Sequence, residues 1–387
     1  MKDQAFWNNL KPFIQENWQK ANFARGTSIQ EQTIPLSLEG KDIIAESPTG
    51  TGKTLAYLLP LLNKINAEDK NMQAIILASS QELVMQILGE IQKWGEGSGI
   101  RSASFIGGAN VKRQLEKLKK HPHIAICTPG RALELIKQKK LKMHAVKMVV
   151  LDEADQLLVA EHIGTVKQIV KATLLDRQVV LFSATLTKNT ENLANELTKN
   201  PEIIRVEKDE TIEAATVDHI YFQAEHRDKI KIMEKISRLE NSKILVFVKD
   251  IGNLTVLHEK LAYKNIQTSM LHSDLNKMER SKSVNGFRKG KTNVLLATDV
   301  AARGLDIEKI THVVHYDLAS DITQYTHRSG RTGRFGAAGT VISIVTEREE
   351  RELKQYAREL DIPLSKKTFY EGKIAEYAPK AASNRKK

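Results

Sequence analysis

Short apolar runs that alternate with longer amphipathic stretches limit most strongly what this chain can fold into. The amphipathic stretches include residues 81–94, 229–240 and 253–264. The apolar runs cover residues 74–78, 124–127, 148–151, 179–182, 244–248, 294–297, 312–315 and 341–345. A short apolar run followed by a stretch of helical period predicts a strand followed by a helix. A series of such pairs predicts βαβ units with parallel sheets.

The series is interrupted by an acidic stretch without a strong apolar period at residues 206–218. At 387 residues the chain is also longer than one hydrophobic core usually supports. We therefore expect an α/β protein of two domains, each a mostly parallel sheet flanked by helices. The expected boundaries are residues 1–207 for the first domain, 208–216 for a short linker, 217–365 for the second domain and 366–387 for a basic, flexible tail.

The balance of charges and the cysteine content limit the possible partners and the cellular compartment. Lys and Arg exceed Asp and Glu by 59 − 47 = 12. This excess suits a polyanionic partner, although solvated surface lysines would also explain it. Cys127 is the only cysteine, which excludes an internal disulfide and a cysteine cluster for zinc, and the apolar run before it predicts a buried structural thiol. Neither the N-terminus nor the apolar run at residues 56–62 suits a signal peptide or a membrane span, so we expect a cytoplasmic protein without membrane contacts.

A phosphate-binding loop is predicted at residues 45–54, where AESPTGTGKT follows a short apolar run and precedes a helical stretch. Gly50 and Gly52 would let successive backbone N–H groups face a phosphate at the helix N-terminus. Lys53 would reach the β- and γ-phosphates of ATP, and the Thr54 hydroxyl would ligate Mg²⁺. The remaining predicted ATP contacts in the loop are Ser47, Thr49 and Thr51. Ser47 departs from the general pattern, which has glycine there.

Acidic residues follow the apolar run at residues 148–151 directly. Taken alone, Asp152 and Glu153 fit either surface charge at the start of a helix or a metal site at the edge of a sheet. A phosphate-binding loop requires a carboxylate on a second strand, and this requirement favours the metal site. Asp152 would then bind Mg²⁺, and Glu153 would polarise the attacking water.

Four motifs in a fixed order make the chain resemble the DEAD-box ATP-dependent RNA helicases. They are Lys53 in its loop, DEAD at residues 152–155, SAT at 183–185 and HRSGRTGR at 327–334. The resemblance implies two RecA-like domains that close on ATP and single-stranded RNA. Such proteins separate duplexes locally, without long-range translocation.

The resemblance also implies roles for individual residues. Phe23 would stack on adenine and Gln30 would hydrogen-bond its edge, Asp306 would meet the ribose, and Arg331 and Arg334 would stabilise charge at the γ-phosphate. The residues implied to couple hydrolysis to strand separation are Asp155, Ser183, Thr185, His327 and Arg328. The residues implied to contact the RNA backbone are Gly107, Gly108, Thr128, Pro129, Gly130, Arg131, His272 and Thr298.

The chain departs from the family pattern in its RNA-binding motifs. The family sequence Pro-Thr-Arg-Glu-Leu-Ala is replaced by Ser-Ser-Gln-Glu-Leu-Val at residues 79–84, so Gln81 stands where an arginine is usual. In the adenine-binding segment Gly26 replaces the usual proline, which affects the stiffness of that loop rather than the choice of adenine. In the RNA-binding motifs, Lys277 stands where the family has glutamine. We expect retained ATPase activity with an altered, weaker grip on RNA.

The sequence thus predicts an RNA-stimulated ATPase that unwinds RNA or remodels ribonucleoproteins, with ATP and Mg²⁺ as cofactors. A DNA-directed helicase is disfavoured by the motifs. An ATP-gated RNA clamp or assembly platform with little unwinding is the alternative from another class. Ribosome assembly or RNA turnover in a bacterium is the expected process, with ribosomal precursors or protein partners as targets.

Overall fold

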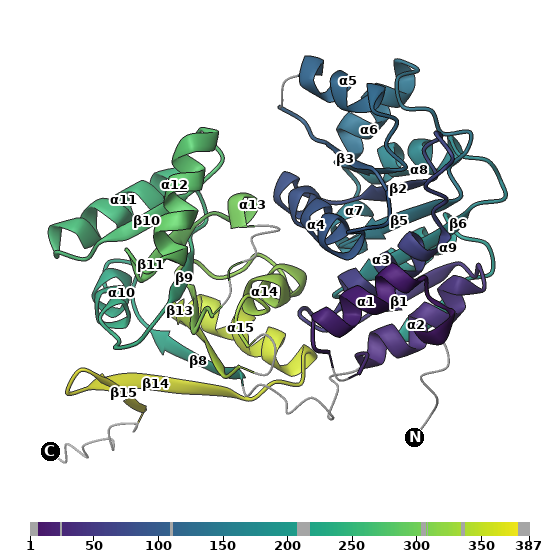
Figure 1. Ribbon diagram of the computed structural model, residues 1–387. Coiled ribbons are helices and arrows are strands. Elements are labelled where there is room, and N and C mark those ends of the chain that lie inside the picture. The colour runs from purple at the N-terminus through teal and green to yellow at the C-terminus, as the bar shows by residue number, and fades with distance from the viewer. Residues whose placement is uncertain are drawn as a thin grey trace, which may run out of the picture. The chain divides into compact units, whose positions relative to one another are not determined.

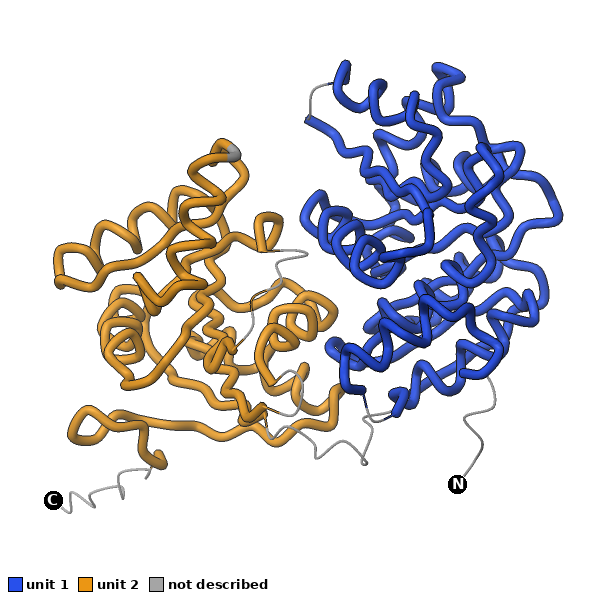
Figure 2. Tube along the Cα trace, viewed as in Figure 1, with its two compact units in different colours: residues 1–210, 303–306 blue, residues 211–302, 307–387 orange. Residues whose placement is uncertain are grey.

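A computed structural model describes residues 7–23, 25–108, 111–206, 217–302, 307, 309–333 and 337–377, except for the side chain at position 277. The described residues form two compact units (Figure 2). The first contains those up to position 206 and the second those from position 217 onward. The linker expected at residues 208–216 and the last residues of the expected tail, 378–387, lie outside the described residues.

The first unit is built on a seven-stranded sheet in which all strands are parallel, in the order β3-β4-β2-β5-β6-β1-β7. Its strands are β1 (Ile43–Glu46), β2 (Ala74–Leu77), β3 (Ser102–Phe105), β4 (Ile124–Cys127), β5 (Met148–Asp152), β6 (Gln178–Ser183) and β7 (Glu202–Arg205). Its helices are η1 (Trp7–Asn9), α1 (Pro12–Lys20), α2 (Ser28–Leu38), α3 (Lys53–Lys64), α4 (Gln81–Trp94), α5 (Val111–Lys119), α6 (Pro129–Lys137), α7 (Ala154–Leu157), α8 (Ile163–Lys171) and α9 (Lys188–Asn195).

Helices cover both faces of this sheet (Figure 1). Successive strand residues point to opposite faces, so a strand buried on both faces must be apolar throughout. In β5, Val150 packs into one hydrophobic cluster, while Val149 and Leu151 pack into another. This double burial explains why the apolar runs of the sequence are continuous rather than alternating.

The second unit contains an eight-stranded sheet in the order β10-β11-β9-β12-β13-β8-β14-β15, parallel except for β15. Its strands are β8 (Val217–Gln223), β9 (Ile244–Phe247), β10 (Thr268–Leu271), β11 (Val294–Ala297), β12 (His312–His315), β13 (Gly339–Val345), β14 (Leu364–Tyr370) and β15 (Lys373–Glu376). Its helices are α10 (Lys229–Ser237), α11 (Ile251–Tyr263), α12 (Lys277–Arg288), α13 (Asp299–Ala302), α14 (Ile322–Ser329) and α15 (Glu347–Glu359). Both units therefore have the α/β architecture expected from the sequence.

The prediction of a flexible tail from residue 366 is wrong for its first part. Residues 364–370 and 373–376 form the hairpin of β14 and β15, and the expected domain end at residue 365 falls inside β14. Phe369 stacks on Phe222 of β8 with ring centroids 4.9 Å apart. Lys366 lies over the Tyr221 ring, 5.9 Å from its centroid. The lysines of β14 made this segment look polar in the sequence, although the Lys366 side chain packs along an aromatic ring.

Two further expectations concern Cys127 and membrane spans. Cys127 is a fully buried free cysteine at the end of β4, and burial raises the pKa of its thiol, as a structural role requires. Among the described helices, none is both long and apolar enough to cross a bilayer.

Candidate functional site

The predicted phosphate loop and the acidic motif lie at one edge of the first sheet. All strands of a parallel sheet end at the same edge, and β5, β6 and β1 are neighbours there. The phosphate loop follows β1, Asp152 ends β5 and Ser183 ends β6. The Ser47 N–H donates to the Ser183 carbonyl oxygen at 3.1 Å, which joins the start of the loop to the end of β6. The strand order thus brings together motifs that are far apart in the sequence.

The phosphate loop is folded around its own lysine. Gly50 and Gly52 have φ values of 83° and 91°, which favour glycine, and Gly52 directly precedes α3. The Lys53 ammonium donates to the carbonyl oxygens of Ser47 at 2.5 Å and Pro48 at 2.8 Å. The Ser47 and Thr51 hydroxyls hydrogen-bond each other at 2.7 Å. The serine that replaces the usual glycine therefore has a structural function inside the loop.

Gln30 joins the predicted adenine-binding segment to the phosphate loop. Its amide oxygen accepts from the Thr27 N–H, and its amide nitrogen donates to the Gly52 carbonyl oxygen, both at 3.1 Å. A Cβ atom on Gly52 would lie 2.5 Å from that amide nitrogen, so a larger residue there would displace the Gln30 amide. An amide group has two donors and two acceptor lone pairs, so Gln30 retains capacity to bind adenine.

Phe23 is the predicted stacking partner of adenine, and its ring is 45% exposed. It stacks on Trp94, with centroids 6.0 Å apart and an interplanar angle of 19°, and meets the edge of Trp18 at 5.0 Å. Two tryptophans that the sequence analysis did not select therefore support this ring. Half of its surface remains accessible to a planar ligand.

Asp152 is 5% exposed and each of its carboxylate oxygens accepts a hydrogen bond. Oδ2 accepts from the Tyr57 hydroxyl at 2.7 Å, and Oδ1 accepts from the Glu153 N–H at 2.9 Å. Burial, with the charge of Glu153, raises the pKa of Asp152 to about 6, although the Tyr57 bond and Lys53 oppose this shift. Tyr57 was missed in the sequence, although it follows Lys53 by four residues and so lies on the same helix face.

Glu153 combines an unusual backbone with a short hydrogen bond. Its φ and ψ of 52° and 53° are left-handed, a conformation that non-glycine residues seldom adopt and that often marks functional sites. Its Oε2 accepts from the Ser79 hydroxyl at 2.5 Å. Ser79 follows β2 and was also missed, because only the strand order makes β2 a neighbour of β5.

The predicted coupling residues of the first unit form one hydrogen-bonded cluster. The Ser183 hydroxyl donates to Asp155 Oδ1 at 2.7 Å, and the Thr185 hydroxyl donates to Asp155 Oδ2 at 3.3 Å. Asp155 and Ser183 are 8% and 1% exposed. Ser183 therefore binds the acidic motif rather than simply ending a strand. The coupling role of the cluster stays a prediction.

The predicted RNA contacts of the first unit follow the adjacent strands β3 and β4. Gly107 and Gly108 come after β3, and Thr128 directly precedes α6 after β4. A Cβ atom on Gly107 or Gly130 would meet no described atom within 4 Å, so both glycines face open space. Pro129 and Arg131 lie in the first turn of α6. Arg131 is only 8% exposed and forms an ion pair with Glu134 at 3.2 Å.

The predicted RNA contacts of the second unit also lie on adjacent strands. His272 follows β10 and Thr298 follows β11. The Thr298 N–H donates to the Leu271 carbonyl oxygen at 3.1 Å, so Thr298 is bonded to the residue before His272. Thr298 is 7% exposed.

Arg328 is 3% exposed and bonded within the second unit. Its Nε and Nη2 donate to the two carboxylate oxygens of Asp299, each at 2.7 Å, and Nη1 donates to the Asp317 carbonyl oxygen at 2.7 Å. The guanidinium also lies over the Phe247 ring, 5.0 Å from its centroid. These contacts give Arg328 a structural role that was not predicted from the sequence. Its predicted role in coupling stays a prediction.

Two of the remaining predicted residues, His327 and Arg331, lie near the end of α14 in the second unit. His327 is in its last turn, and Arg331 follows it and is 8% exposed. Arg334 and Asp306 lie outside the described residues. The roles predicted for all four therefore stay predictions.

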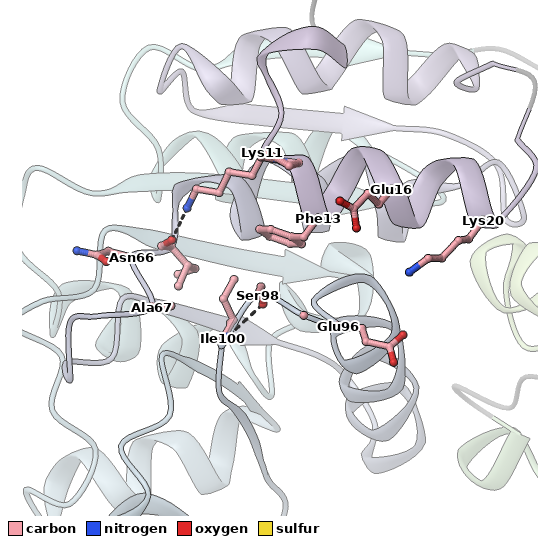
Figure 3. A pocket seen from close by; sticks show the side chains of 12 residues that line it. Lys11, Phe13, Glu16, Lys20, Asn66, Ala67, Glu96, Ser98 and Ile100 are labelled. Carbon is pink, nitrogen blue, oxygen red and sulfur yellow. Dashed lines mark hydrogen bonds between the residues drawn. The ribbon is translucent and has the colours of Figure 1, made fainter.

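A hollow of about 610 Å³ lies elsewhere in the first unit, between α1 and the segments that follow α3 and α4 (Figure 3). Lys11, Glu16, Lys20 and Glu96 give its lining both charges, and the Lys11 ammonium donates to the Ile65 carbonyl oxygen at 2.6 Å. The lining contains no residue of the phosphate loop or the acidic motif. We therefore do not assign it to the nucleotide.

Both units of the chain match known protein families. Residues 27–193 match the family described as DEAD/DEAH box helicase, and residues 226–336 match the helicase conserved C-terminal domain. The chain belongs to the DEAD/DEAH box helicase family. The predictions of the family and of two RecA-like domains are therefore confirmed.

This DEAD/DEAH box helicase has similar relatives over nearly its whole length. It is 55% identical to the probable ATP-dependent RNA helicase YfmL of Bacillus subtilis, covering 95% of this chain and 98% of the relative. It is 48% identical to the DEAD-box ATP-dependent RNA helicase CshC of Bacillus cereus, covering 98% and 97%. Among solved structures, S. cerevisiae Dbp5 bound to RNA and ADP BeF3 is 31% identical with a TM-score of 0.84, covering 95% of both chains.

Proposed function

We propose that this protein hydrolyses ATP at the carboxyl edge of its first sheet and uses the hydrolysis to separate short RNA duplexes. One observation supports this proposal most directly. The phosphate loop, the acidic motif and Ser183 follow β1, β5 and β6, and the predicted RNA loops follow β2, β3 and β4 on the same edge. Nucleotide and RNA would therefore bind to adjacent halves of one rigid sheet.

The protein is an ATP-dependent RNA helicase, as its family membership and its relatives indicate. The neighbouring Dbp5 structure is described as bound to RNA and ADP BeF3, and the Mss116 helicase, 27% identical with a TM-score of 0.82, as bound to single-stranded RNA and UDP-BeF. ATP and RNA are accordingly the ligands that we assign to this chain.

ATP would replace the hydrogen bonds that now hold the phosphate loop closed on itself. Lys53 would exchange the carbonyl oxygens of Ser47 and Pro48 for phosphate oxygens, while Gly50 and Gly52 present backbone N–H groups. Gln30 and Phe23 would hold the adenine. Glu153 would orient the attacking water.

The residues present suit Mg²⁺, which supplies charge neutralisation at the phosphates when it is bound. Burial and the charge of Glu153 raise the pKa of Asp152, so a cation beside this carboxylate would be stabilised. Thr54 lies in the first turn of α3, one turn before Tyr57, whose hydroxyl donates to Asp152. Among the described residues no group of three or more His, Cys, Asp or Glu could hold a metal. A Mg²⁺ ion would be held by Asp152, Thr54 and the phosphates of the substrate.

RNA would be held mainly through its backbone. Gly107 and Gly130 leave open space at the sheet edge, and Thr128 directly precedes α6, whose N-terminal N–H groups can face phosphate. Backbone contacts give little sequence preference, and the 2′-hydroxyl would distinguish RNA from DNA. Ribosomal precursors or other ribonucleoproteins in the bacterial cytoplasm are the targets that we propose.

The proposal is tested by the rate of ATP hydrolysis with RNA, with DNA and with neither, followed by release of a labelled strand from a short duplex. We expect stimulation by RNA and ATP-dependent strand release. Stimulation by DNA alone would refute the RNA assignment. Tight ATP-dependent RNA binding without strand release would favour the clamp. The Glu153→Gln variant should bind nucleotide and fail to hydrolyse it.

A further inference from the structure

The hydrogen bond between Ser79 and Glu153 joins the predicted RNA path to the residue assigned to activate water. The Ser79 hydroxyl donates to Glu153 Oε2 at 2.5 Å across 74 positions of sequence. Charge-assisted hydrogen bonds of this length are among the strongest that side chains form. The family pattern has proline at this position, and proline has no hydroxyl group to donate. The bond is therefore a property of this chain rather than of the family pattern.

The sheet order shows in which direction this bond holds the carboxylate. β2 lies on one side of β5, whereas β6 and β1 lie on the other. The phosphate loop follows β1, and Ser79 follows β2. The bond therefore directs the Glu153 carboxylate toward the strand that lies away from the phosphate loop. The phosphate loop would hold the γ-phosphate on the opposite side of β5, near Lys53, so we expect the attacking water on that side.

The other neighbours of Ser79 belong to the predicted RNA path. Ser80 is the N-cap of α4, where its hydroxyl accepts from the Leu83 N–H at 3.1 Å. Gln81 begins α4, and its amide nitrogen lies 3.9 Å from the position of a Cβ atom on Gly108. Ser79 lies just before these residues of the β2–α4 turn, so an RNA phosphate that shifted the turn on binding would also shift Ser79. The bond to Glu153 would respond to that displacement.

We propose that Ser79 is a positioning residue that holds Glu153 in a resting orientation until RNA occupies the β2–α4 turn. RNA binding breaks the bond, and the carboxylate then turns toward the attacking water. The backbone of Glu153 is left-handed and stays in place in this proposal. Rotation of the side chain alone then moves the carboxylate from Ser79 to the attacking water. This inference rests on the proposed function, because it concerns the RNA dependence of the same hydrolytic site.

The Ser79→Ala variant tests the inference through the ratio of kcat with saturating RNA to kcat without RNA. Losing the bond should raise the RNA-free kcat about tenfold, the factor to which a hydrogen bond of about 1.4 kcal/mol corresponds. The RNA-saturated kcat and the KM for ATP should stay unchanged, because the bond is already broken in that state. Ser79→Thr retains the hydroxyl and should restore the low RNA-free rate.

Ser98→Ala is the control, because it removes a hydroxyl of the same unit that bonds only the nearby backbone groups of Gly95 and Ile100 and lies outside the nucleotide and RNA sites. It should leave the ratio unchanged. An unchanged ratio in Ser79→Ala, with normal RNA stimulation of the parent, would overturn this inference alone. If Ser79→Ala lowered kcat equally with and without RNA, the inference would also be overturned. The bond would then hold Glu153 in the orientation that hydrolysis needs. A parent protein without RNA stimulation would overturn both the inference and the proposed function.

Discussion

Replacing Arg328 by alanine should destabilise the second unit far more than an ordinary surface substitution. The change removes three hydrogen bonds of 2.7 Å and leaves the Asp299 carboxylate, which is 17% exposed, without its bidentate partner. Breaking a buried ion pair by removing one member costs about 3–5 kcal/mol. With a urea dependence of about 2 kcal/mol per M for a unit of this size, the midpoint should fall by about 2 M.

The three tryptophans allow this effect to be assigned to one unit. Trp7, Trp18 and Trp94 all lie in the first unit, so tryptophan fluorescence reports its unfolding, whereas circular dichroism reports both units. The Arg328→Ala substitution should move a circular dichroism transition and leave the fluorescence transition in place.

Arg351→Ala is the control for this prediction. Arg351 is an exposed arginine of the same unit, and its ion pair with Glu347 at 3.8 Å should contribute little. If Arg328→Ala shifts the circular dichroism midpoint no more than Arg351→Ala does, the structural role assigned to Arg328 is wrong.

Three further predictions concern pH, the phosphate loop and RNA affinity. Burial holds the pKa of His315 well below its usual value, so the unfolded chain binds this proton first as the pH falls. The second unit should therefore lose up to about 1.4 kcal/mol per pH unit below about pH 6.5, measured by urea unfolding, and His315→Asn should flatten this slope. Gly52→Ala should weaken nucleotide binding in a titration, because its Cβ would lie 2.5 Å from the Gln30 amide and displace it. Gly40→Ala is the control: it has a similar φ of 87°, its Cβ meets no described atom, and it should bind nucleotide normally. Gln81→Arg should tighten RNA binding and steepen its salt dependence by about one counterion, and unchanged affinity would contradict a phosphate at this position.

The strands in the middle of each sheet could be predicted from the sequence, and the strands near the edges could not. Every predicted apolar run is a strand, because strands covered on both faces are apolar throughout. β7 lies at an edge and has only one buried residue among four, and β10 likewise ends its sheet with only Leu271 buried. Their polar residues face solvent, so no apolar pattern marks them.

The phosphate loop could be located in the sequence because its contacts are local. Its glycines, lysine and threonine act within a few residues of one another, and their spacing is fixed by the start of one helix. Tyr57 and Ser79 contact the acidic motif from 95 and 74 positions away. These contacts depend on which strands are neighbours, and no local pattern contains that information.

The strand order also explains how two consecutive acidic residues obtain different environments. Asp152 is the last residue of β5, so its side chain points into the buried layer where Tyr57 of α3 donates to it. Glu153 leaves the strand through a left-handed turn, and its carboxylate meets Ser79 beyond the neighbouring strand end. Burial and the adjacent negative charge raise the pKa of Asp152, which favours a cation beside it. The partly exposed Glu153 can exchange its serine partner for water. One strand end thus gives the proposed metal ligand and the proposed water-activating group different environments.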